Sequence, residues 1–157
     1  MRRCLSRLLL SIALLAIGSI HGAQADTPPA VTPDELIAAR KASMEAQSSR
    51  LAAIMQAIVI NADIRPFAAT GEAIATWGRN LLDLFPAGTE VGNDTQARPA
   101  VWSDRAGFEM AAARLTDAAH SLAKAAVGGD QAEFIKAYRG TMLACAACHV
   151  IYRSGRN

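Results

Sequence analysis

The sequence lacks several patterns that characterise common classes of protein. It contains no stretch that alternates apolar and polar residues as a β-strand does, and it has no internal repeat. It has no basic stripe with interleaved aromatic residues, so we expect no binding to nucleic acid. A Ser/His/Asp order and paired carboxylates are also missing, and we therefore do not expect an enzyme.

A long apolar run is missing too, because the most apolar stretch covers only residues 8–20. A membrane-spanning helix needs about 20 apolar residues, so we expect no stable membrane anchor. The run follows a basic start and ends at an Ala-Gln-Ala motif at residues 23–25, an order that is typical of a secretory signal peptide. We expect residues 1–25 to be removed and residues 26–157 to form one exported domain.

Cysteine is scarce, and its position points to the chemistry. Of the three cysteines, one precedes the apolar run, and the other two are Cys145 and Cys148. His149 follows directly, which completes the motif C-x-x-C-H close to the C-terminus. On a helix, positions i, i+3 and i+4 share one face, so these three side chains should point the same way.

Four kinds of site could use this motif. A structural zinc site needs four ligands, and His120 is the only further histidine of the mature chain. A thioredoxin-type redox pair follows a strand, which this sequence lacks. A plain disulfide leaves the adjacent histidine unexplained. Covalent attachment of haem c uses both thiols and the histidine together, and we favour it for that reason.

Four segments of the mature chain have the apolar spacing of helices. The first covers residues 32–59 and begins with a capping box formed by Thr32 and Glu35. Apolar residues recur along it every seven positions, at Ile37, Met44, Leu51 and Ile58. The second helix covers about residues 66–84, and a long loop at residues 85–102 follows it.

The third and fourth helices are predicted from their capping signals. Ser103 is the expected N-cap of the third helix, and the glycine pair at residues 128–129 ends it. Asp130 is the start signal of the fourth helix, which carries the C-x-x-C-H motif. The short turns within each helix pair favour antiparallel neighbours. The sequence therefore predicts an all-α protein, an antiparallel four-helix bundle with haem c bound near the C-terminal helix.

Four segments resemble those of the class II cytochromes c, the cytochrome c′ family: "ARKASM", "FPAGTE", "ARPAVWSD" and "CAACHVIYR". They occur in the family's order, and the resemblance covers essentially the whole mature chain. The family implies a periplasmic four-helix bundle with one covalently bound haem c, often a homodimer through its first two helices. No methionine follows His149, so any sixth iron ligand must lie upstream.

The resemblance also implies roles for particular residues. Cys145 and Cys148 would form the thioethers, and His149 would be the proximal iron ligand. The other matching positions surround the haem in this family: Arg40 and Lys41 at a propionate, Met44 at the sixth iron position, Phe85 in the distal wall, Thr95 at a propionate, and Arg153 beyond the proximal histidine.

Two functions remain open at this point. If the Met44 sulfur reaches the iron, the site is six-coordinate and low-spin, which suits electron transfer with redox partner proteins of the periplasm. If the bundle holds Met44 off the iron, an apolar five-coordinate site would admit nitric oxide or carbon monoxide. Met44 also fits simple core filling. We take electron transfer as the first hypothesis because it requires only the haem, and gas binding as the alternative.

Covalent attachment makes a prediction about mass. Expressed in a host that attaches haem c, the exported protein should be heavier than residues 26–157 alone by the mass of one haem. Mass spectrometry under denaturing conditions measures this difference. A mature chain with the mass of its amino acids alone would contradict the haem hypothesis.

Overall fold

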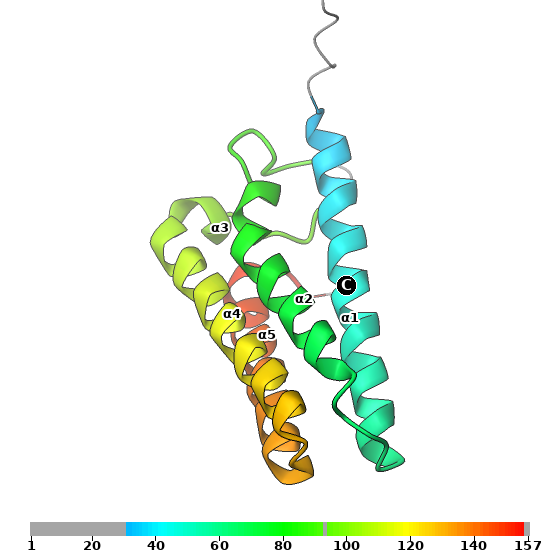
Figure 1. Cartoon of the computed structure of the whole chain (residues 1–157). Helices are drawn as coiled ribbons and strands as arrows, with labels where there is room; N and C mark the ends of the chain where they lie inside the picture. Colours follow the sequence, from blue (N-terminus) through cyan, green and yellow to red (C-terminus); the bar gives the residue numbers. More distant parts are fainter. Residues whose placement is uncertain (1–30, 93, 156–157) are drawn as a thin grey trace, which may run out of the picture. The chain divides into compact units, whose positions relative to one another are not determined.

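The computed structural model describes residues 31–92 and 94–155, and the expected signal peptide lies outside these residues. The elements are α1 (Pro33–Val59), α2 (Phe67–Asn80), the 3₁₀ helix η1 (Leu81–Leu84), α3 (Ala100–Ser103), α4 (Arg105–Gly128) and α5 (Gln131–Tyr152). No strand forms in this part of the chain beyond an isolated bridge between Ala97 and Arg153. The four long helices lie side by side, as the sequence predicts (Figure 1).

The first helix begins where the sequence predicts. The Thr32 hydroxyl accepts the Glu35 N–H at 3.3 Å, and the Glu35 carboxylate accepts the Thr32 N–H at 2.7 Å. This capping box satisfies N–H groups that have no partner within the helix. The backbone hydrogen bond from Thr32 also lowers the pKa of Glu35.

The start of α4 differs from the expectation. Ser103 is the last residue of the short helix α3, and the N-cap of α4 is Asp104, whose carboxylate accepts the Gly107 N–H at 3.2 Å. The prediction of Ser103 as N-cap was wrong because residues 100–103 form a helical turn of their own. Asp104 is held by a distant residue, since the Tyr152 hydroxyl donates to its carboxylate at 2.8 Å.

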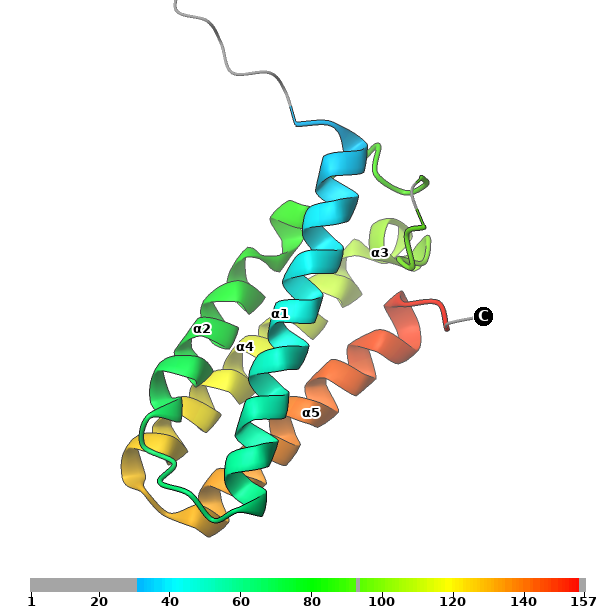
Figure 2. The same ribbon diagram turned by 90° about the vertical axis from the view of Figure 1, so that its right-hand side faces the viewer.

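The turn between α4 and α5 follows the predicted signals. Gly129 has a φ of 71°, a left-handed conformation that glycine adopts without strain. The Asp130 carboxylate then accepts the N–H groups of Ala132 and Glu133 at 2.9 and 3.1 Å. Figure 2 shows this turn at the same end of the bundle as the α1–α2 turn, with α3 at the other end. The end of α5 that carries C-x-x-C-H therefore lies at the end with the long loop.

The core consists of two apolar clusters. The larger cluster contains Leu51, Ile54, Ile64, Ile74, Ala75, Leu115, Ala119, Leu122, Ala126, Phe134 and Tyr138. The smaller cluster contains Leu81, Phe85, Val101, Phe108, Ala112 and Tyr152. In residues 31–92 and 94–155 no helix has the length and apolar character that crossing a membrane requires.

Close packing of α2 on α4 depends on small residues. A Cβ added at Gly71 would lie 2.7 Å from the backbone nitrogen of Ala123 and 2.8 Å from its Cα. A Cβ at Gly78 would lie 2.7 Å from the Thr116 hydroxyl oxygen. These approaches leave no space for a side chain, so the glycines allow the two helices to touch.

We therefore predict that Gly71→Ala destabilises the bundle, because the added methyl group collides with backbone atoms that cannot move alone. The free energy of unfolding should fall by about 1–3 kcal/mol in urea denaturation. Gly140→Ala on α5 is the matched control, since nothing lies within 4 Å of the added Cβ. That control should be neutral or stabilising by up to about 1 kcal/mol; equal behaviour of the two variants would contradict the packing argument.

Candidate functional site

The C-x-x-C-H motif lies near the C-terminal end of α5 and is turned toward the interior. Cys145 packs against the larger cluster, and Cys148 packs against the smaller one. Both thiols are free and half-buried, and His149 is half-buried beside them. The rotation of α5 therefore brings the three side chains together, as the helical spacing predicts.

Burial changes the acidity of all three groups. It raises the pKa of Cys145, and together with Cys145 it raises the pKa of Cys148 to about 11. Burial and the charge of Arg153 lower the pKa of His149. At neutral pH the imidazole is therefore uncharged, the form that binds metals. A thioredoxin-type pair needs a lowered thiol pKa, so these shifts argue against a thiol–disulfide enzyme.

Met44 is half-buried on α1 and packs against the smaller cluster, the same cluster that contacts Cys148. Phe85 belongs to this cluster, and its ring centroid lies 5.1 Å from that of Phe108. The structure thus brings Met44, Phe85 and Cys148 to one apolar cluster. Ligation of iron by Met44 stays a prediction.

Arg40 is almost fully buried, with 4% of its surface exposed. Its guanidinium donates to the hydroxyl and carbonyl oxygens of Thr89 at 3.3 and 2.9 Å, and it lies 4.7 Å from the Phe85 ring centroid. Burial lowers the pKa of Arg40 and Glu90 raises it, but a guanidinium keeps its charge. Arg40 therefore fastens the loop after Phe85 to α1, and its contact with a propionate stays a prediction.

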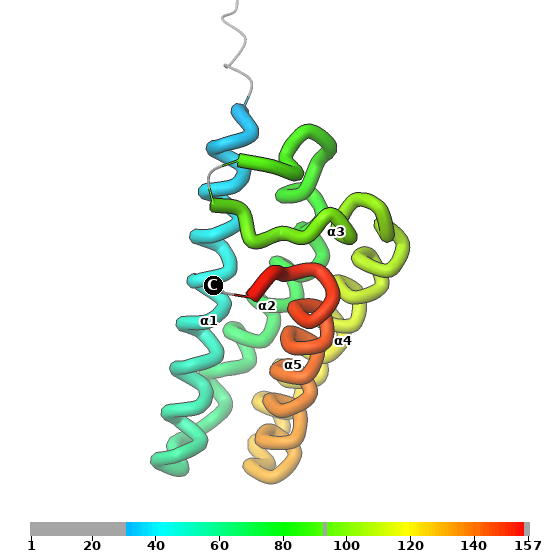
Figure 3. Tube along the Cα trace, turned by 180° about the vertical axis from the view of Figure 1, so that it is seen from behind, coloured from blue at the N-terminus to red at the C-terminus, as the bar shows by residue number. Residues whose placement is uncertain are grey.

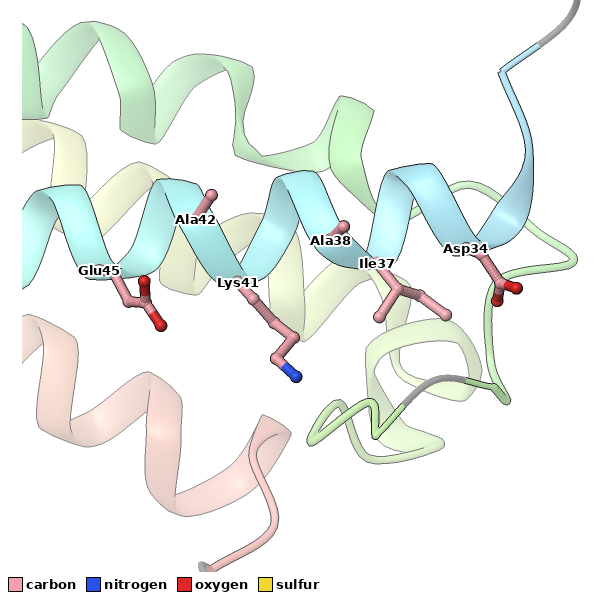
Figure 4. Close-up of a pocket in the computed structure, with 6 residues that line it drawn as sticks. All are labelled: Asp34, Ile37, Ala38, Lys41, Ala42 and Glu45. Carbon is pink, nitrogen blue, oxygen red and sulfur yellow. The ribbon is translucent and has the colours of Figure 1, made fainter.

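Lys41 is exposed and lines a pocket of about 330 Å³ along α1, which also includes Asp34, Ile37 and Glu45. Figure 4 shows the Lys41 side chain projecting from α1 on the same side as Ile37 and Asp34. Its ammonium group can reach an anion that approaches this side of the helix. The contact of Lys41 with a propionate stays a prediction.

Thr95 belongs to the loop before α3, and Arg153 binds the same loop from the end of α5. The Thr95 hydroxyl accepts the N–H of Ala97 at 3.2 Å, so its contact lies within the loop. The Arg153 guanidinium donates twice to the side-chain oxygen of Gln96, at 2.9 and 2.7 Å. The loop at residues 95–98 therefore lies against the end of α5.

Two of these partners, Thr89 and Gln96, could not be predicted as site residues from their sequence positions alone. Thr89 belongs to the "FPAGTE" segment, so its place in that segment was the available signal. Gln96 offered no signal, because a loop glutamine has no characteristic spacing. Both act through hydrogen bonds to residues about 50 positions away, which no local pattern reveals.

The donor set fits haem c better than the competing sites. No group of three or more His, Cys, Asp or Glu side chains able to hold a metal ion occurs in residues 31–92 and 94–155, so zinc is not supported. The free thiols and the neutral imidazole supply what haem attachment requires. The buried indole N–H of Trp77, which packs against both clusters, has no hydrogen-bond partner among the described residues.

Known proteins of one family resemble this chain along most of its length. A family model described as Cytochrome C' matches residues 35–153. A cytochrome c' of Rhodospirillum rubrum is 32% identical over 156 residues, which cover 96% of this chain and 99% of the relative. A carbon monoxide-bound variant of cytochrome c prime from Alcaligenes xylosoxidans matches with a TM-score of 0.71 and 27% identity over 79% of this chain and 98% of that one. A nitric oxide complex of another variant of that protein has the same TM-score and identity, over 80% of this chain and 98% of that one.

Burial of Cys148 makes a prediction about thiol reactivity in the protein made without haem. Only the thiolate reacts with iodoacetamide, and a pKa of about 11 in place of 9.0 leaves about 100-fold less thiolate at pH 8. Alkylation of Cys148 should therefore be about 100-fold slower in the folded chain than in urea, and it should accelerate about tenfold per pH unit up to pH 10. Peptide mass spectrometry over time measures the rate; equal rates in folded and unfolded chain would contradict burial of the thiol.

Proposed function

This chain belongs to the cytochrome c′ family and is a haem c protein, and on that premise we propose that it transfers electrons through one haem held at the end of α5. The observation that carries this proposal is that Met44 and Cys148 pack against one apolar cluster. A thioether on α1 and the attachment helix α5 thereby come to the same region of the interior. When bound, haem c supplies an iron that changes between the ferric and ferrous states.

The residues of α5 would anchor the cofactor. The thiols of Cys145 and Cys148 would carry the two thioether links, and the half-buried His149 would offer its neutral imidazole as proximal ligand. Arg153 would add a positive charge one helical turn beyond that imidazole. A positive charge near the iron favours the ferrous state over the ferric state, so it raises the reduction potential.

The residues of α1 and the loop would bind the rest of the cofactor. Met44 would be the sixth ligand, which gives a histidine–methionine pair and a raised potential. Phe85 would close the apolar wall beside it. Arg40 and Lys41 would face the propionates, with Thr95 near them on the loop. A role of Arg40 near the cofactor is supported by its contacts, because Thr89 holds the guanidinium beside the Phe85 ring.

Gas binding is the second candidate, and two observations favour it. The region around Met44 is apolar, which suits small neutral ligands, and the similar structures from Alcaligenes xylosoxidans were solved with carbon monoxide and nitric oxide. In that case Met44 stays off the iron and leaves the sixth position for the gas. Neither function needs substrate turnover, so we propose a protein that is not an enzyme.

We further propose that the protein works in the periplasm after removal of residues 1–25, with periplasmic redox proteins as partners. A homodimer through α1 and α2 is expected from the family. The exposed side of α1 carries small residues, and these would let a helix of a second chain approach closely, which supports the homodimer: Ala38, Ala42, Ala46 and Ala53. Analytical ultracentrifugation of the mature protein measures whether it is a monomer or a dimer.

Absorption spectroscopy distinguishes the two functions. We expect low-spin spectra for the ferric and ferrous protein and, in the ferric state, a weak far-red band from sulfur bound to iron. High-spin spectra with rapid uptake of carbon monoxide would favour gas binding. A purified, exported chain without any haem absorption would contradict both functions.

We predict that Met44→Ala changes the ferric spectrum from low-spin to high-spin and speeds carbon monoxide binding, because the variant loses the sulfur ligand. Met55→Ala is the matched control on the same helix, about 16 Å further along its axis, and it should leave the spectrum unchanged. If Met44→Ala also keeps the wild-type spectrum, Met44 is a core residue and not a ligand.

A further inference from the structure

Gln96 holds the charged residue that follows the haem-binding motif. Arg153 comes one helical turn after His149, and its backbone N–H donates to the His149 carbonyl at 3.1 Å. Two of its guanidinium nitrogens, Nε and Nη2, donate to the single side-chain oxygen of Gln96, at 2.9 and 2.7 Å. Both distances are those of well-formed hydrogen bonds. The direction of the Arg153 side chain is therefore set by Gln96.

Gln96 is itself held in place by the backbone around it. The backbone carbonyl oxygen of Gln96 accepts the N–H of Ser154 at 2.8 Å and the hydroxyl of Ser154 at 3.1 Å. Ala97 forms an isolated bridge with Arg153, and the Arg98 N–H donates to the Tyr152 carbonyl at 2.9 Å. Figure 3 shows this loop lying beside the end of α5. These backbone contacts fix the position of Gln96, so that it is a better-defined hydrogen-bond acceptor than a glutamine on a flexible surface loop.

The chemistry of the acceptor matters because an amide is neutral. A carboxylate at this position would form an ion pair with Arg153 and cancel most of its field at the end of α5. With no acceptor, the long arginine side chain would extend into water, where its charge is screened. A glutamine does neither of these things. It holds the guanidinium in one direction and leaves the positive charge intact.

We propose that Gln96 is a positioning residue for the haem: it holds the Arg153 guanidinium, with its charge intact, beside the proximal histidine and thereby keeps the reduction potential of the iron high. The inference rests on the proposed function, since it needs haem bound at His149. The inference concerns a loop residue that lies outside the C-x-x-C-H motif.

The test measures the midpoint potential of the haem-loaded protein by spectroelectrochemistry. Gln96→Leu removes the acceptor, and Gln96→Glu cancels the charge of Arg153. Both variants should lower the potential, with the larger change in Gln96→Glu. For Gln96→Leu, the ratio of ferrous to ferric protein at a fixed electrode potential should fall about threefold or more, as expected for one partly screened charge near the iron.

The link to Arg153 is tested by a double-mutant cycle. The change caused by Gln96→Leu should disappear when Arg153→Leu is already present, because the arginine charge is then absent. Gln56→Leu, at an exposed position on α1, is the matched control and should leave the potential unchanged. Resonance Raman spectra of the iron–histidine bond give a second readout. A residue that acts through Arg153 would change these spectra only while Arg153 is present. A loop residue with a purely structural role would show no such dependence on Arg153.

Folding failure is separated from failure of the inference by a milder variant. Gln96→Asn keeps the amide but draws its oxygen back by one methylene, so the bonds to Arg153 are lost while the backbone bonds to Ser154 remain. The inference would be overturned, and the proposed function left standing, by either of two results. One is an unchanged reduction potential in folded Gln96→Leu and Gln96→Asn. The other is a shift by Gln96→Leu that is as large in the Arg153→Leu background as in the wild-type protein. Absence of haem from the wild-type protein would instead overturn the proposed function.

Discussion

The site depends on the rotation of α5 about its own axis. The buried residues of α5 are spaced by three or four residues or by sums of these steps, so one face of the helix must turn inward: Phe134, Tyr138, Thr141 and Tyr152. Cys145 and Cys148 lie on that face and cannot avoid the interior. A helix rotated by one residue would expose the aromatic rings to water, at a cost of about 2 kcal/mol for each ring. Core packing thereby directs the chemistry of the motif.

A second constraint is the long loop between η1 and α3, which several arginines attach to the helices, Arg40 and Arg153 among them. Arg40 binds the loop at Thr89 from α1, and Arg153 binds it at Gln96 from the end of α5. Apolar residues of the loop, such as Phe85, also pack in the smaller cluster, so hydrogen bonds and apolar contacts hold the loop together. Because both arginines stand close to the proposed cofactor site, the loop couples the position of these charges to the fold.

Short sequence signals predicted a helix boundary well where the groups that cap the helix lie close together in the sequence. The capping box of Thr32 and Glu35 and the left-handed Gly129 are each decided within a few residues, and the structure confirms them. The N-cap of α4 was predicted at Ser103 and lies at Asp104, whose carboxylate binds Tyr152, 48 positions away. Of the site, the C-x-x-C-H face and the position of Met44 on the apolar stripe of α1 followed from helical spacing, whereas Thr89 and Gln96 did not.

The sequence by itself determined the all-α class, the order of the helices and the identity of the thiol and imidazole groups, because periodicity, capping and motif spacing act over one or two helical turns. Only the tertiary structure decided which residues hold Arg40 and Arg153 and that Met44 shares a cluster with Cys148. Those contacts join residues about 50 to 100 positions apart. They form only when the whole bundle has closed, and a sequence pattern carries no record of them.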